Sequence, residues 1–178
     1  MQNKPANIQK IHALRSQAGF TLLIAALVSS IVLALGVSIY EIATKEVQLS
    51  SLGRDSQFAF YAADTAAECA LYWDFRFSYF ATSTPSDPAA QNPSCDGQPL
   101  GATGRSDIFP YTMTSGQINI FSDTTAAGGY CVQVAVTKSR DPSTQAVRTL
   151  VHADGYNVPC ATITSAPQAL QRSVELNY

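Results

Sequence analysis

Residues 20–40 read FTLLIAALVSSIVLALGVSIY and contain no charged side chain. A helix rises about 1.5 Å per residue, so a run of this length covers the roughly 30 Å hydrocarbon core of a bilayer. Residues 1–19 contain Lys4, Lys10 and Arg15 and no acidic residue. A basic flank of this kind stays in the cytoplasm, so the sequence predicts a single-pass membrane protein whose residues 41–178 face outward.

Hydropathy alone leaves three interpretations of this segment. A plain membrane anchor needs nothing beyond the apolar length. A secretory signal peptide fits badly, because the run exceeds an h-region of about 7–15 residues and no small-residue cleavage site follows a short core. The third interpretation places a processing site before the apolar run, at the bond between Gly19 and Phe20.

The residues around that bond favour the third interpretation. The run Gln17-Ala18-Gly19-Phe20-Thr21-Leu22-Leu23 resembles the prepilin-peptidase site of type IV pilins and type II secretion pseudopilins. In that family a basic leader ends in Gly, a Phe follows, and the apolar helix begins at once. The resemblance implies a cleaved leader of residues 1–19, N-methylation of Phe20 as the new N-terminus, and a transmembrane or filament-core helix of residues 20–40.

One residue departs from the family pattern. Most members carry Glu at the fifth mature position, where it neutralises the N-terminal amine of a neighbouring subunit, and here that position is Ile24. An uncompensated amine in a bilayer or filament core is costly, so we expect this subunit to lack that contact. Within the family the missing Glu goes with minor subunits that start or cap a filament. PilX-type minor pilins and the tip pseudopilin of type II secretion are examples, so a major pilin is the less favoured interpretation.

The helix is predicted to continue beyond the membrane. No proline occurs between Gly19 and Pro85, so no residue of that kind forces the helix to end. Small and apolar residues recur at spacings of four and three, as on one face of a helix that packs on a sheet. They are Leu52, Ser56, Ala59, Ala63, Ala66, Ala70 and Trp73. Residues 54–68 also resemble the alanine-rich signature of PilX-type minor pilins, with Asp64 where Glu is common.

The remainder of the chain predicts a variable loop and a small sheet. Four prolines mark residues 73–105 as irregular. Alternating or apolar runs predict strands at residues 117–121, 129–138, 146–153 and 170–176, although Arg172 interrupts one face of the last. Short turns favour an antiparallel meander. We therefore expect an α+β fold, with a long N-terminal helix packed on a four-stranded antiparallel sheet, which is the pilin-like architecture.

The four cysteines are widely spaced. Cys69, Cys95, Cys131 and Cys160 form no Cys-x-x-Cys pair and have no histidine nearby, which favours two disulfides in an oxidising compartment over a zinc site. Four cysteines allow three pairings, and the sequence does not choose between them. We prefer Cys69–Cys95 with Cys131–Cys160, because each pair then closes a local segment.

The sequence contains no recognisable catalytic motif. Its two histidines, His12 and His152, accompany no nucleophile elbow, phosphate-binding loop, dinucleotide motif or zinc-protease motif. The loop acids lack the spacing of a calcium-binding loop, so solvated turns account for them better. They are Asp87, Asp96, Asp107, Asp123, Asp141 and Asp154. We therefore predict no enzyme activity, no metal and no cofactor.

Charge also bears on the partners. The formal net charge of -2 less the three leader cations leaves -5 (that is, -2 - 3) after residue 19, which disfavours a nucleic-acid partner. The resemblance implies a minor pilin or pseudopilin that initiates, caps or decorates a type IV pilus-like filament. Its partners would be other pilins or pseudopilins, the prepilin peptidase, the inner-membrane assembly platform and membrane lipid. The location would be the cytoplasmic membrane and then an extracellular filament.

Two other functions stay open from the sequence. A membrane-tethered extracytoplasmic binding domain that never assembles would use the same apolar segment and would keep its leader. An adhesion or DNA-uptake subunit is less favoured, because the outer domain is acidic.

Overall fold

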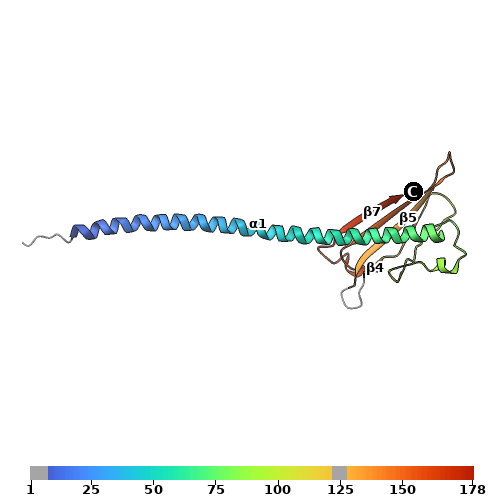
Figure 1. Ribbon diagram of the computed structural model, residues 1–178, viewed down its shortest axis with the longest axis horizontal. Coiled ribbons are helices and arrows are strands. Elements are labelled where there is room, and N and C mark those ends of the chain that lie inside the picture. Colours follow the sequence, from blue (N-terminus) through green and yellow to red (C-terminus); the bar gives the residue numbers. More distant parts are fainter. Residues whose placement is uncertain (1–7, 122–127) are drawn as a thin grey trace, which may run out of the picture. The chain divides into compact units, whose positions relative to one another are not determined.

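The computed structural model describes residues 8–121 and 128–178. Its first element is one continuous helix, α1 (Ile8–Phe77), and the strands follow it in the chain (Figure 1). The chain divides into two compact units, Met1–Ser50 and Ser51–Tyr178. We call the second unit the head. A long N-terminal helix followed by antiparallel strands confirms the α+β class that the sequence predicted.

The main sheet of the head has five strands, where the sequence predicted four. They are β3 (Tyr111–Thr114), β4 (Ile118–Ile120), β5 (Tyr130–Arg140), β6 (Val147–Tyr156) and β7 (Gln171–Asn177). Their order is β3-β5-β6-β7 with every neighbour antiparallel, and β4 also pairs with β5. The four predicted strands correspond to β4, β5, β6 and β7, which form the expected meander.

The additional strand, β3, lies on the same side of β5 as β4. Val132 of β5 pairs with β4 on one side and with β6 on the other, so β4 and β3 follow one another along one edge. Ser115 bridges the gap between them, because its N–H donates to the Val134 carbonyl (2.8 Å) and its Oγ accepts from the Val134 N–H (2.9 Å). With only four residues after Pro110, β3 is too short for its alternation to be recognised from sequence.

The predicted variable loop begins later than expected and contains some regular structure. The helix α1 continues to Phe77, four residues past the predicted start at residue 73. The loop then contains a short 3-10 helix, η1 (Pro88–Gln91), and a two-residue hairpin of β1 (Ser94–Cys95) with β2 (Gln98–Pro99). Arg105 holds the start of the loop, since its guanidinium donates to the carbonyls of Tyr79 (2.6 Å), Ala81 and Ser83 (2.9 Å).

The core of the head is the interface between the alanine face of α1 and one face of the sheet. The buried apolar residues of the helix are Ala59, Ala62, Ala63, Ala66, Ala67 and Ala70, each at most 1% exposed. Opposite them lie alternate residues of β5 and β6, namely Val132, Val134, Val136, Val151 and Ala153. Small side chains on the helix let its backbone approach the strands closely, which is the packing that the sequence stripe predicted.

The closest approach is at Gly155 of β6. A Cβ atom on this residue would lie against the carbonyl oxygen of Ala59 and 3.0 Å from the Cα of Ala63. Because both atoms belong to the helix backbone, a side chain here would require α1 to move away from the sheet. Glycine is therefore part of the packing, as close backbone approach requires.

Arg172 occupies a position on the helix-facing side of β7. Its Nε donates to Ser56 Oγ (2.7 Å), so the charged group reaches the first turns of α1 in the head and keeps a polar partner. This contact explains why an arginine interrupts a face that otherwise carries Val174 and Leu176, both half-buried.

We expect Gly155→Ala to destabilise the head by about 2 kcal/mol, the usual cost of forcing an extra group into a packed interface. Fluorescence of Trp73, the single tryptophan, during urea unfolding measures this change. Gly116→Ala is the matched control, because a Cβ there meets nothing within 4 Å. Equal unfolding midpoints for the two variants would contradict the close packing.

Candidate membrane-spanning and assembly segment

Residues 20–40 of α1 are apolar and exposed on all sides. From residue 19 to residue 50 every side chain is exposed except the half-buried Thr44. Among the described residues one helix, counted from Gly19 to Phe77, is long and apolar enough to cross a membrane by length and composition. A helix that is apolar all round requires lipid or other helices around it.

The three serines of this segment bond to its own backbone. Ser29, Ser30 and Ser38 donate their hydroxyl hydrogens to helix carbonyls three or four residues earlier, at 2.7, 2.8 and 3.0 Å. A membrane-spanning helix must bond its polar groups internally, because hydrocarbon offers no partner. The serines are therefore compatible with an apolar environment.

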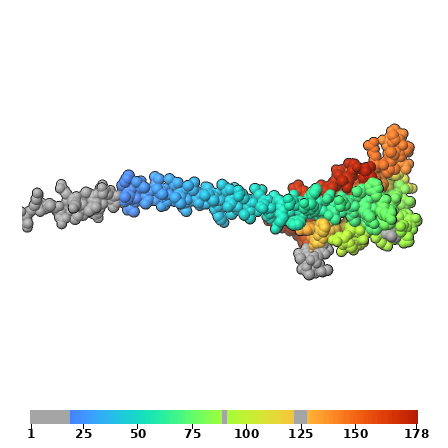
Figure 2. Space-filling view, in the orientation of Figure 1, coloured from blue at the N-terminus to red at the C-terminus, as the bar shows by residue number. Residues whose placement is uncertain are grey.

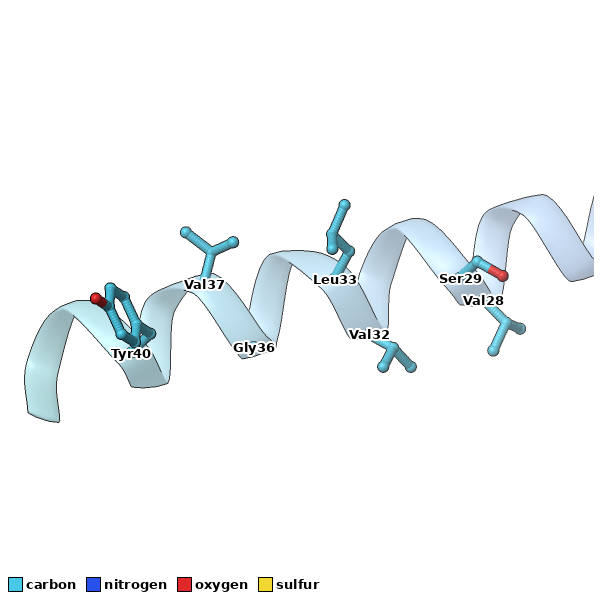
Figure 3. Close-up of a pocket in the computed structure, with 7 residues that line it drawn as sticks. All are labelled: Val28, Ser29, Val32, Leu33, Gly36, Val37 and Tyr40. Carbon is cyan, nitrogen blue, oxygen red and sulfur yellow. The ribbon is translucent and has the colours of Figure 1, made fainter.

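A shallow groove runs along one face of this helix where Gly36 has no side chain. Its lining residues are Val28, Ser29, Val32, Leu33, Gly36, Val37 and Tyr40. Figure 3 shows the neighbouring side chains projecting on either side of Gly36. A Cβ at Gly36 would meet nothing within 4 Å, so no contact within the described chain requires glycine there. The glycine costs helix stability, about 1 kcal/mol relative to alanine, and leaves room for a neighbouring helix.

The predicted processing bond lies within α1. Gly19 meets no other part of the described chain, and Phe20 is 66% exposed. Glycine is about 1 kcal/mol less favourable than alanine in a helix, so it lowers helix stability at the bond to be cleaved. Ile24, where the family carries Glu, is 45% exposed on the same apolar helix. The side chains of the basic leader lie outside the described residues.

Both preferred cysteine pairs form disulfides in the head. Cys69 of α1 bonds to Cys95 of β1, with Cα atoms 6.1 Å apart. Cys131 of β5 bonds to Cys160 in the 3-10 helix η2 (Cys160–Thr162), with Cα atoms 4.6 Å apart. Their sequence separations of 26 and 29 correspond to stabilisation on the order of 3–4 kcal/mol each in the chain-entropy description. They anchor the two long connections of the head to α1 and to the sheet.

His152 has a carboxylate partner but no nucleophile. Its Nε2 lies 3.2 Å from Asp154 Oδ1, and Ser173 Oγ donates to that same oxygen (2.5 Å) and not to the imidazole. Burial acts to raise the pKa of Asp154, but hydrogen bonds from Ser173 and Gln171 together with His152 hold it below its usual value. A catalytic triad needs the hydroxyl on the histidine, so this group reads as a hydrogen-bonded cluster on the outer face of the sheet.

Two of the scattered loop acids have local roles, and Asp154, predicted to lie in a loop, lies in β6. Asp96 Oδ2 accepts from the Phe121 N–H (2.6 Å), and Asp141 caps its own turn. Hydrogen bonds from Ser143 and Thr144 lower the pKa of Asp141 to about 2. Asp123 lies outside the described residues. Within those residues no three metal-ligating side chains converge.

A buried polar cluster at the end of α1 was not predicted. Asp74 Oδ2 accepts from Lys138 Nζ (2.6 Å) and from the Tyr178 hydroxyl (2.6 Å), and Lys138 also donates to Thr149 Oγ1 (3.1 Å). Asp74 is 8% exposed. Its position one turn after Ala70 on the buried face was the available signal, but its partners lie 64 and 104 residues away in sequence. The cluster joins α1, β5 and β6 to the residue after β7.

Comparisons with known proteins add no assignment. The chain matches no protein-family model, no curated protein and no solved structure.

Removing the hydroxyl of Tyr178 tests the cluster. Burial, followed by the hydrogen bond to Asp74, raises the pKa of Tyr178 well above its ordinary value. The folded protein therefore keeps this proton as the unfolded chain loses it above pH of about 10, so stability is full below that pH and falls as the pH rises. We expect Tyr178→Phe to lower the free energy of unfolding near neutral pH by about 1–2 kcal/mol and to flatten the alkaline decline.

Urea unfolding followed by Trp73 fluorescence from pH of about 8 to about 11 measures both effects. Tyr156→Phe is the control, because burial raises the pKa of Tyr156 too but the side chain makes no contact with Asp74. Parallel pH profiles for Tyr178→Phe and the unsubstituted protein would contradict the role assigned to this proton.

Proposed function

We propose that this chain is a minor subunit of a type IV pilus-like filament, a pilin or pseudopilin cleaved between Gly19 and Phe20. The observation that carries the proposal is the junction itself. A basic leader, a Gly-Phe pair and a fully exposed apolar helix follow one another without a gap. A plain anchor needs the helix but does not need the Gly-Phe junction at its start.

The geometry of α1 supports a dual use of residues 20–40. A segment that is exposed on every side and whose serine hydroxyls bond to its own backbone suits lipid before assembly. The groove at Gly36 offers a neighbouring helix a close approach after assembly. The same surface therefore fits both environments, as a subunit extracted from a membrane into a filament core requires.

Ile24 favours a place at a filament end over a place in the shaft. With no Asp or Glu in residues 20–40, this chain offers no carboxylate to the N-terminal amine of another subunit. A charge left unpaired in an apolar core is costly, so repeated stacking of identical copies is disfavoured. One copy that initiates or caps the filament avoids that repetition.

A membrane-tethered binding domain is the alternative. The disulfide-bonded head and the exposed apolar helix fit this function as well as they fit a pilin. Processing separates the two, because a tethered domain keeps residues 1–19.

Co-expression with a prepilin peptidase tests the proposal. We expect intact mass and N-terminal sequencing to give a chain that begins at N-methylated Phe20. Gly19→Val should stay uncut, since a β-branched side chain replaces the glycine at the bond to be cleaved. Gly36→Ala should be cut normally, because it also removes a glycine from α1 but lies away from the bond.

An uncut chain under conditions in which a known prepilin is processed would sink the proposal and leave the tethered domain. Equal processing of Gly19→Val and the unsubstituted chain would show that cleavage, if it occurs, uses another bond.

A further inference from the structure

The two edges of the sheet in the head differ in how they are covered. Along the β3 edge, Thr103 exchanges two backbone hydrogen bonds with Thr114, both 2.9 Å, and Gly116 donates its N–H to the Leu100 carbonyl (3.1 Å). The loop before β3 therefore closes this edge. In the described residues no strand or loop pairs with the outer side of β7.

The pairing of β7 shows which backbone groups are open. Thr149 and Tyr178 exchange two hydrogen bonds, at 2.8 and 3.0 Å. Bonded and non-bonded pairs alternate in an antiparallel ladder, so β7 residues 172, 174 and 176 bond to β6. The residues between them direct their N–H and C=O groups away from the sheet. These are Gln171, Ser173, Glu175 and Asn177.

Natural sheets protect edges of this length with proline, lysine, a bulge or a covering segment. Strand β7, which reads QRSVELN, contains no proline and no lysine, and its pairing with β6 is uninterrupted. Its one cation, Arg172, is turned toward Ser56 of α1. Charges also protect edges, and β7 carries two, the inward-turned Arg172 and the exposed Glu175. With no proline, lysine or bulge, and no covering segment among the described residues, the edge still offers a template for another strand.

An apolar margin of α1 lies beside this edge. Strand β7 runs in the same direction as the helix, because Arg172 contacts Ser56 and the Tyr178 ring stacks on Phe75 with centroids 4.8 Å apart. Figure 2 shows β7 at the surface next to the helix. Phe75 is 68% exposed in spite of the stacking.

Helical spacing places three more residues on the flank of α1 that carries Ser56 and Phe75. They are Phe60, Asp64 and Leu71. Phe60 is 46% exposed and Leu71 is half-buried. We call Phe60, Asp64, Leu71 and Phe75 the β7 margin. A strand added beside β7 would have alternate side chains facing this margin, where they would bury its apolar surface.

The charged groups near the edge are three carboxylates and two guanidinium groups. Arg76 lines a shallow pocket with Glu68, Leu71 and Phe75, and Arg172 lies on β7 itself. Among the described residues no ion pair includes Asp64, Glu68 or Glu175. Glu68 and Glu175 are exposed, and Asp64 is half-buried in the margin. These carboxylates form no ion pair in the described part of the chain and outnumber the cations, so the edge complements a strand that carries Lys or Arg.

We propose that the β7 edge binds a β-strand of a different protein chain. The strand would pair its backbone with residues 171, 173, 175 and 177, direct alternate apolar side chains toward Phe60 and Phe75, and bring a cation to Asp64 and Glu68. In strand addition the backbone bonds supply affinity and the alternate side chains supply specificity.

A second copy of the chain fits this edge less well. Its β3 strand is covered by the loop, and within the described residues β7 is the longest strand whose outer side is unpaired. Antiparallel pairing of two β7 strands would turn the two helix segments in opposite directions, since β7 runs parallel to α1. Copies anchored in one membrane hold these segments in the same direction. The inference that the partner is a different chain thus rests on the proposed membrane anchoring. The observation that the β7 edge is open does not depend on it.

The test uses the full chain in membranes of the cells that produce it, with a benzophenone amino acid in place of Phe60. We expect light to crosslink it to one short run of another protein, mapped by mass spectrometry. Glu175→Pro removes an N–H that points to the open edge and no N–H that bonds to β6. It should reduce the crosslink at least tenfold, while Glu175→Ala, which removes only the side chain, leaves it within about threefold.

Two further measurements test whether Glu175→Pro still folds and whether the β7 edge is covered in membranes. The urea midpoint of Glu175→Pro, read from Trp73 fluorescence, should stay near that of Glu175→Ala, which shows that the head still folds. Amide hydrogen exchange should be slower at residues 171, 173, 175 and 177 in native membranes than in the detergent-purified chain.

Absence of a crosslink in those membranes, a crosslink insensitive to Glu175→Pro, or equal exchange in both preparations would overturn the proposal. A crosslink between the β7 strands of two copies would also overturn it, and would count against the shared membrane orientation without bearing on cleavage at Gly19. Cleavage failure alone would leave this proposal standing.

Discussion

The helix α1 approaches the sheet through alanines on its side and a glycine on the other, and the arrangement of the head depends on that short separation. At Ala59, Ala63 and Gly155 no side chain longer than a methyl group separates the two backbones. The single helix covers only part of the sheet. The strands at its margins must therefore be covered by other means. The loop does this at β3, and at β7 the edge stays open.

Within the described residues the buried side-chain polar groups have partners, whereas the outward backbone groups of β7 have none in the sheet. Among the described residues every buried side-chain nitrogen or oxygen has a hydrogen-bond partner, including Asp74 with its lysine and tyrosine. A buried carboxylate without its cation would be strongly destabilising, so this cluster fixes the end of α1 against β5. The three serine hydroxyls of the apolar segment likewise bond to their own helix. The backbone groups along β7 are the contrast, and they require water or another strand.

Two surfaces of the chain are therefore suited to partners of different kinds. Residues 20–40 are apolar on every side and suit lipid or helices, which need no hydrogen bonds from them. The β7 edge combines backbone donors and acceptors with exposed rings and unpaired carboxylates, and suits an extended polypeptide. In the proposed filament subunit the first surface provides attachment to the assembly, and the second provides recognition of one neighbour.

Local patterns in the sequence determined the long helix, its alanine face, four of the five strands and the apolar segment, because each depends on the spacing of neighbouring residues. The cysteines indicated disulfides, but three pairings stayed possible until the fold brought Cys69 to Cys95 and Cys131 to Cys160. Tertiary structure alone decided the contact between Asp74 and Tyr178, the place of β3, and which edge is open. These features join residues far apart in the chain, and no periodicity records which distant groups a fold brings together.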